Sequence, residues 1–197
     1  MISHVIRFLD LKDAYFFTVP TPQKDELLSS WLVRIAVAHN TLPWTFYNLH
    51  FPEYKNIIFS RDVDIWAPKD FLHKLSIKSK LPYERIFQMT LKSYEDILNV
   101  NITSKSSNKD INPIICRGRR NRGFGQRFCS SCLTKNIPYF KKQWRLKNIT
   151  TCEEHNIKLC DKCPNCNLPI SFYKFNIHDK GFLQCWKCGF NLFERQL

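Results

Sequence analysis

The sequence has little glycine and no long apolar run. Only 5 of its 197 residues are glycine, which argues against a low-complexity or collagen-like chain. No stretch approaches the roughly 18 apolar residues of a membrane span. Residues 1–20 carry charges and have no small-residue cleavage site, so they do not resemble a signal peptide. We therefore expect a soluble cytoplasmic protein without a membrane partner.

The sequence also has no cluster of acidic residues. Asp62 and Asp64 are close together, but no other acid or metal-binding motif supports them, and the histidines outside the cysteine-rich segment are isolated. A nuclease or integrase needs grouped carboxylates to hold its metal ions. We therefore predict no catalytic residues and no enzymatic activity.

Positive charge is concentrated in one segment. The formal net charge is +13, and residues 105–150 contain twelve lysines and arginines against a single acid, Asp110. The segments on either side are nearly neutral. A local excess of this size favours a polyanionic or acidic partner.

The first hundred residues show helical periodicity. Apolar residues from Leu27 to Ala36 recur on one helical face, with Asp25 and Glu26 at the expected start and Asn40 as a stop. Further helices are expected after prolines 43, 68 and 82 and across residues 93–98. The pair of helices around residues 77–81 can form a helix-turn-helix or simply pack a helical bundle.

Nine cysteines in a reducing compartment favour metal ligands over disulfides. Two sets of paired ligands have the spacing of closed, four-coordinate structural zinc sites: Cys129, Cys132, Cys152 and His155, then Cys163, Cys166, Cys185 and Cys188. Cys160 is an alternative partner for Cys163. We expect Cys116 and Cys160 to be small buried apolar residues and His178 not to be a ligand.

These patterns predict a mainly α N-terminal domain with a helix-turn-helix-like element, followed by a small α/β zinc-ribbon region with two tandem zinc sites. The expected divisions are a helical domain at 1–100, a polar linker at 101–112 and a basic zinc domain at 113–197. Because the linker is polar, we expect the two domains to share little core.

Basic residues near the first zinc motif are candidate nucleic-acid ligands, because arginine matches phosphate geometry and nearby glycines allow close approach. The candidates are Arg117, Arg119, Arg120, Arg122, Arg127, Lys141, Lys142 and Arg145. The alternative is a solvated basic surface. Three interleaved aromatics, Tyr139, Phe140 and Trp144, either join this surface or pack the core around the zinc.

Several motifs along residues 20–190 resemble, in order, those of the TniQ family of bacterial transposon proteins. In the N-terminal half these are Pro20-Thr21-Pro22, residues 25–36 and Met89-Thr90-Leu91. In the zinc region they are Arg127-Phe128-Cys129, residues 138–144, Cys152-x2-His155, and Leu159 followed by Cys163-Pro164-x-Cys166. The first knuckle lacks the family's usual proline. The chain also stops nine residues after Cys188, without the long C-terminal region of TnsD-like relatives.

The resemblance implies a non-enzymatic adaptor for target-site selection in the bacterial cytoplasm. Such an adaptor couples a targeting device to an AAA+ transposition regulator, usually called TnsC. The short chain favours the version that works with a CRISPR effector and its guide RNA, leaving this protein to contact DNA or RNA backbone and protein surfaces. A stand-alone zinc-ribbon and helix-turn-helix transcription regulator is the alternative.

Overall fold

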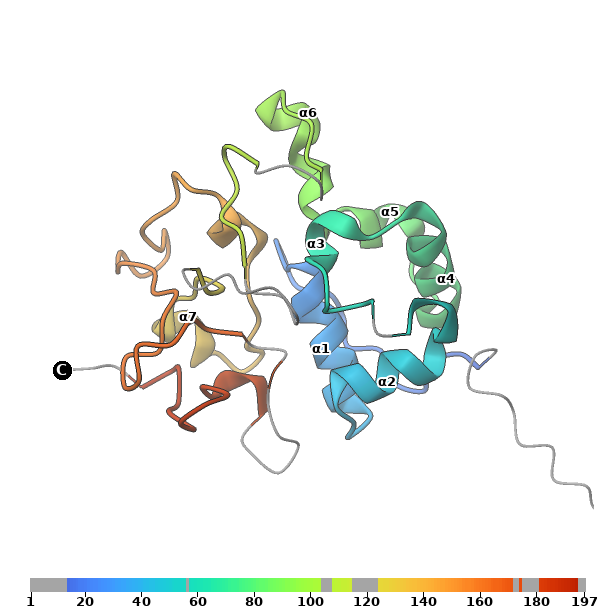
Figure 1. Cartoon of the computed structure of the whole chain (residues 1–197), viewed down its shortest axis with the longest axis horizontal. Coiled ribbons are helices and arrows are strands. Elements are labelled where there is room, and N and C mark those ends of the chain that lie inside the picture. Colours follow the sequence, from blue (N-terminus) through green and yellow to red (C-terminus); the bar gives the residue numbers. More distant parts are fainter. Residues whose placement is uncertain are drawn as a thin grey trace, which may run out of the picture.

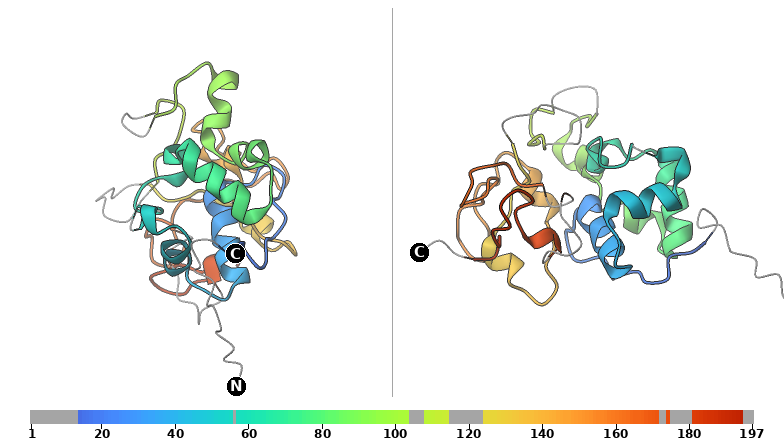
Figure 2. Two further views of the ribbon diagram at one scale, coloured as in Figure 1. Left: turned by 90° about the vertical axis from the view of Figure 1, so that its right-hand side faces the viewer. Right: turned by 60° about the horizontal axis from the view of Figure 1, so that its bottom comes forward.

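The computed structural model of the chain describes residues 14–55, 57–103, 108–114, 124–171, 174 and 181–194. We call the described residues up to 103 the helical half and those from 108 onward the cysteine-rich half. The halves lie side by side, and helix α1 (Leu28–Ala38) lies next to the cysteine-rich half (Figure 1). Two further views of the molecule show the same arrangement (Figure 2).

The described regular structure is mainly helical. In the helical half, α1 is followed by α2 (Pro43–His50), η1 (Pro52–Tyr54), α3 (Val63–Trp66), α4 (Lys69–Ser79), α5 (Tyr83–Phe87), η2 (Leu91–Tyr94) and α6 (Glu95–Leu98). The cysteine-rich half contains α7 (Ser130–Leu133), η3 (Lys142–Arg145) and η4 (Gly181–Leu183). Within the described residues, β pairing is limited to isolated antiparallel bridges. The predicted fold class is confirmed, with little strand in the ribbon region.

Helix α1 forms where the periodic apolar residues predict it. Trp31, Leu32 and Ile35 on this helix are fully buried, and Asn40 ends the segment with a φ of 51°. The predicted start was two residues early. Asp25 and Glu26 precede the first turn, and Glu26 is buried against the cysteine-rich half instead of lying at the helix end.

The predicted proline-initiated helices are also present. Pro43 occupies the first turn of α2, where its missing N–H has no helical partner to lose. Pro68 and Pro82 immediately precede α4 and α5. The connection between these two helices turns at Lys80, whose φ is 57°. Since α5 has only five residues, DNA reading by this helix pair stays a prediction.

A charged residue near this turn is buried. Lys78 lies in the last turn of α4 and is only 7% exposed. Its Nζ donates to the carbonyl of Ala14 at 2.9 Å and lies 5.5 Å from the centroid of the Phe51 ring. The long alkyl stem lets the lysine pack inside while its ammonium group finds a backbone partner.

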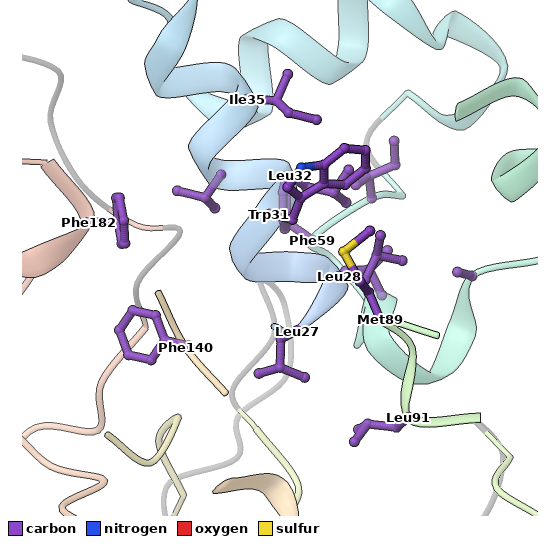
Figure 3. Packing of buried hydrophobic residues seen from close by; sticks show 14 of the residues in the cluster. Leu27, Leu28, Trp31, Leu32, Ile35, Phe59, Met89, Leu91, Phe140 and Phe182 are labelled. Atoms are coloured by element: carbon purple, nitrogen blue, oxygen red, sulfur yellow. The ribbon is translucent and has the colours of Figure 1, made fainter. Parts of the chain in front are cut away.

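The buried core is continuous across the two halves. Leu27 and Trp31 belong to the same apolar cluster as Phe140, Trp144 and Phe182 of the cysteine-rich half. In Figure 3, Phe140 and Phe182 lie on one side of α1, while Trp31, Leu32 and Met89 lie on the other. This differs from the expectation of little shared core, because α1 buries apolar side chains on both sides.

Backbone and side-chain hydrogen bonds reinforce this contact. The N–H of Leu27 donates to the carbonyl of Phe140 at 3.0 Å, and the N–H of Phe140 donates to Ser30 Oγ at 3.0 Å. The N–H of Lys142 donates to the carbonyl of Asp25 at 2.6 Å. The segment before α1 and the segment before η3 therefore lie in a fixed register, which positions the cysteine-rich half.

The segment expected to be a polar linker takes part in packing. Ile102, Ile111 and Asn112 are buried, and the N–H of Asn112 donates to the carbonyl of Arg145 at 2.8 Å. The isoleucines interrupt the polar sequence and supply apolar surface.

No helix within the described residues has the length and apolar character needed to cross a bilayer.

Candidate metal centres and a buried ion-pair network

The first predicted ligand set meets at one point. Cys129 caps α7, where its Sγ accepts a hydrogen bond from the N–H of Cys132 at 3.4 Å. A tight turn brings Cys152 and His155 to the same place. His155 Nδ1 lies 3.5 Å from Cys129 Sγ, 3.3 Å from Cys132 Sγ and 3.6 Å from Cys152 Sγ. One nitrogen and three sulfur atoms thus surround a common centre.

The second set forms a similar centre from four cysteines. Cys163 and Cys188 have their sulfur atoms 3.6 Å apart, as do Cys166 and Cys185. Cys163 and Cys166 lie on one turn, closed by a hydrogen bond from the Asn167 N–H to the Cys163 carbonyl. Cys185 and Cys188 lie on a second turn, closed by a hydrogen bond from the Gly189 N–H to the Cys185 carbonyl. In each of the two sets, all four ligand atoms lie within 4.8 Å of one another.

These arrangements fit a tetrahedral metal ion. A zinc–sulfur bond of about 2.3 Å implies sulfur atoms about 3.8 Å apart on a tetrahedron, close to the 3.6 Å separations here. Burial raises the pKa of Cys163 to about 12 and raises that of Cys132 as well. At Cys188, desolvation is outweighed by hydrogen bonds, that of the Phe190 N–H first, which lower the pKa to about 6. Without a cation, Cys132 and Cys163 therefore resist ionisation. A divalent metal would supply the charge that their thiolates require.

Cys160 calls for one correction. Cys160 lies outside both ligand groups, so the geometry selects Cys163 and Cys166 as a pair. Its side chain was expected to be buried, but the residue is exposed. The backbone of Cys160 pairs with Phe128 in an antiparallel bridge, and this pairing leaves the thiol at the surface. Cys116 and His178 lie outside the described residues.

A carboxylate next to the first centre binds two lysines, one of which, Lys141, was predicted to contact nucleic acid. Glu154 accepts hydrogen bonds from Lys135 and Lys141, which hold the pKa of its carboxyl well below the ordinary value. Its Oε2 lies 3.9 Å from Cys132 Sγ. Lys141 is therefore buried in an ion pair beside the metal ligands, a position that its place in a basic segment did not indicate.

Other predicted nucleic-acid ligands also have partners within the chain. Lys142 is buried, and its Nζ donates to the Gln88 carbonyl at 2.6 Å and to Ser93 Oγ at 2.7 Å. The half-buried Arg127 donates through Nη1 to the carbonyls of Leu146 and Ile149 at 3.1 and 2.6 Å. Arg117, Arg119, Arg120 and Arg122 lie outside the described residues. Contact of any of these side chains with nucleic acid stays a prediction.

Arg145 lies at the centre of a buried network that joins the halves. Its side chain is 1% exposed. Nη2 donates to Asp62 Oδ2 at 2.5 Å, Nη1 to Asp64 Oδ2 at 3.3 Å and Nε to the Asn112 carbonyl at 3.1 Å. Asp64 also accepts hydrogen bonds from the N–H and the Oγ of Ser29, both at 2.7 Å. The two acids therefore fix a cation that lies about eighty residues away in the sequence.

Sequence reasoning missed this network. It weighed Asp62 and Asp64 as catalytic acids and Arg145 as a phosphate ligand, because no local spacing connects residues so far apart. The available signal was a pair of acids two residues apart at the start of α3, together with a distant segment rich in cations. Their oxygens are occupied by Arg145 and Ser29, which makes a structural role the direct interpretation.

The network predicts a specific pH dependence. Burial and the nearby charge of Asp62 raise the pKa of Asp64 from 3.8 to about 7, outweighing the attraction of Arg145. The folded state then binds this proton more tightly than the unfolded state. Proton binding by Asp64 therefore contributes its full stabilisation of the fold below about pH 4, and this stabilisation is lost as pH rises through 7. Relative to Asp64→Asn, the parent should lose stability as the pH is raised from 4 to 7. Denaturant unfolding of both proteins from pH 4 to 8 measures the difference, and a constant difference would contradict the raised pKa.

A comparison with known families assigns the chain. The TniQ family model matches residues 17–159, a span that includes nearly all of the helical half, the Arg145 network and the first candidate metal centre. The second centre lies beyond the matched residues. A search of curated proteins finds no match. TniQ proteins are non-catalytic proteins associated with target selection in transposition. Since the match covers more than half of the sequence, the chain belongs to the TniQ family.

Proposed function

We propose that this protein is a target-site selection adaptor. It bridges a targeting device, such as a CRISPR effector with its guide RNA, to an AAA+ transposition regulator of the TnsC type. The observation that supports this proposal is the span of the family match, which covers residues from both halves. These halves share one core and the Arg145 network, so a partner on one half is held in a fixed position relative to a partner on the other.

We further assign Zn²⁺ to both candidate centres. Cysteine and histidine are the ligands that zinc prefers, and four protein ligands leave no open position for a substrate. The zinc ions would then stabilise the cysteine-rich half and take no part in strand chemistry. Contact with DNA or RNA backbone is assigned to Arg127 and to the arginines at 117, 119, 120 and 122.

Binding with purified components tests the bridge. The tagged full-length chain is mixed with the AAA+ ATPase, with the guide-RNA effector, and with both partners together. We expect each partner to bind alone and all three components to elute as one complex, because separate surfaces can be occupied at once. In a reconstituted reaction, omitting the chain should abolish insertion at the programmed site while untargeted activity persists.

Two controls sharpen this test. Each partner is added in excess to the preformed complex of the chain with the other. Displacement would mean that the two share one surface, and the bridging role would be rejected. On-target insertion at the full level without the chain would reject the target-selection role itself.

A further inference from the structure

An exposed tryptophan lies on the second candidate metal centre. Trp186 is 41% exposed and lies in the turn between the ligands Cys185 and Cys188. This turn is fixed by backbone hydrogen bonds from the Cys185 N–H to the Phe190 carbonyl at 2.8 Å and from the Gly189 N–H to the Cys185 carbonyl at 2.9 Å. The residue lies beyond the span that matches the family, so the family assignment does not account for it.

Two contacts hold the indole ring in place. Its Nε1 donates to the carbonyl of Pro169 at 3.3 Å, and Lys174 Nζ lies 5.1 Å from the ring centroid. A cation at this distance interacts favourably with the ring. The ring is therefore oriented before any partner arrives, although much of its surface remains in contact with water.

Two further lysines lie near this ring in the fold. Lys187 follows Trp186 directly, and Lys162 forms an antiparallel bridge with Pro169, the residue that binds the indole. Both lysines are exposed. Among the ion pairs of the described residues, none includes Lys162, Lys174 or Lys187.

At the first candidate metal centre, by contrast, the nearby lysines form ion pairs. There, Glu154 neutralises both Lys135 and Lys141, so the cations next to that centre already have a carboxylate partner. The lysines around Trp186 retain their charge for a ligand. An oriented flat ring with one ammonium group 5.1 Å from its centroid, and two more exposed lysines on the neighbouring backbone, suits a ligand that offers both a planar aromatic surface and negative charge.

We propose that Trp186 and lysines 162, 174 and 187 form a stacking site for single-stranded nucleic acid. The indole takes an unpaired base, and the lysines bind the flanking phosphates. Stacking on an exposed aromatic ring suits single strands because every base has a flat face, whereas bases in a duplex are already stacked on their neighbours. The site goes beyond the bridging role and does not depend on it.

Oligonucleotide binding by the full-length, metal-loaded chain tests this site. The probes are a fluorescent twelve-nucleotide poly(dT) strand, the matching poly(rU) strand and a duplex of equal length, measured by anisotropy. Trp186→Ala should weaken single-strand binding by about 5- to 100-fold and leave its salt dependence unchanged, because a neutral ring is lost. Trp186→Phe should retain most of the affinity, since it keeps an aromatic face.

Tyr15→Ala is the matched control. Tyr15 is also an exposed aromatic, at 60%, with Lys80 Nζ 4.9 Å from its ring centroid, but it lies in the helical half. This variant should bind the single strand as the parent does. An equal loss in both alanine variants, or no loss in Trp186→Ala, would overturn the proposal. So would equal weakening of duplex binding by Trp186→Ala.

A second pair of substitutions keeps the test valid if Trp186→Ala loses metal. Replacing Lys162 and Lys187 by Gln leaves the ring and the metal ligands intact. The slope of log affinity against log salt on single strands should become shallower by about 1.4 in total, or about 0.7 for each lost phosphate contact. An unchanged slope would show that these lysines do not bind the strand and would contradict the site.

Discussion

Cys129→Ser is expected to unfold the cysteine-rich half. The change removes one ligand of the first candidate metal centre and the sulfur that accepts the Cys132 N–H at the start of α7. In the described part of this half, β pairing is limited to isolated bridges, and α7 has four residues. Metal binding in such units contributes about 10–16 kcal/mol of folding free energy, more than regular structure here can replace.

The effect should extend into the helical half. Leu27 and Phe140 are joined by a backbone hydrogen bond and belong to one buried apolar cluster, so unfolding the cysteine-rich half exposes part of the α1 surface. We expect the helical signal in circular dichroism to melt at a lower temperature in Cys129→Ser. Elemental analysis of the parent should give two zinc ions per chain.

Cys160→Ser is the matched control for this substitution. Cys160 is an exposed thiol outside both ligand groups, so its replacement should change the unfolding free energy by about 0.5 kcal/mol or less. Zinc content should stay at two. A parent that binds one zinc ion or none, or a cysteine-rich half that stays folded after chelation, would show that the metal does not hold this part together.

Local patterns predicted the two groups of candidate metal ligands and most helix starts. A pair of cysteines two residues apart carries its own turn geometry, so Cys163 and Cys166 are recognisable without knowledge of distant contacts. Pro43 marks the start of α2 for a similarly local reason, since its fixed φ suits the first helical turn. These features are determined within a few residues, which is why the sequence suffices.

Residues that connect the two halves were not predictable in the same way. Positive charge in residues 105–150 suggested a surface for a polyanion, yet Lys141, Lys142 and Arg145 are buried. Phe140 and Trp144 in the same segment are buried in the common core, and a short irregular segment that buries these rings carries its neighbouring cations inward. Composition gives the amount of charge but not the direction of each side chain or its partner elsewhere in the chain.

Arg145→Ala is expected to destabilise the protein by about 3–5 kcal/mol, because removal of one partner leaves buried carboxylates without a cation. Asp64 is fully buried, Asp62 is largely so, and the Asn112 carbonyl loses its bond to Nε. A loss of this size is a large share of the roughly 5–15 kcal/mol that a domain has in total. Denaturant unfolding followed by circular dichroism measures it. The loss should be smaller at pH 5 than at pH 8, since Asp64 can then bind a proton and remove its own charge.

Lys74→Ala is the matched control for Arg145→Ala, because Lys74 pairs with Glu53 at the surface, where the two side chains are 48% and 38% exposed. An exposed pair contributes about 0–1 kcal/mol, so this variant should unfold nearly as the parent does. Adding Asp64→Asn to Arg145→Ala should recover part of the lost stability, since the double variant no longer buries that unpaired charge. If Arg145→Ala instead keeps the stability of the parent and loses only nucleic-acid binding, Arg145 acts as a phosphate ligand and the buried network does not join the halves.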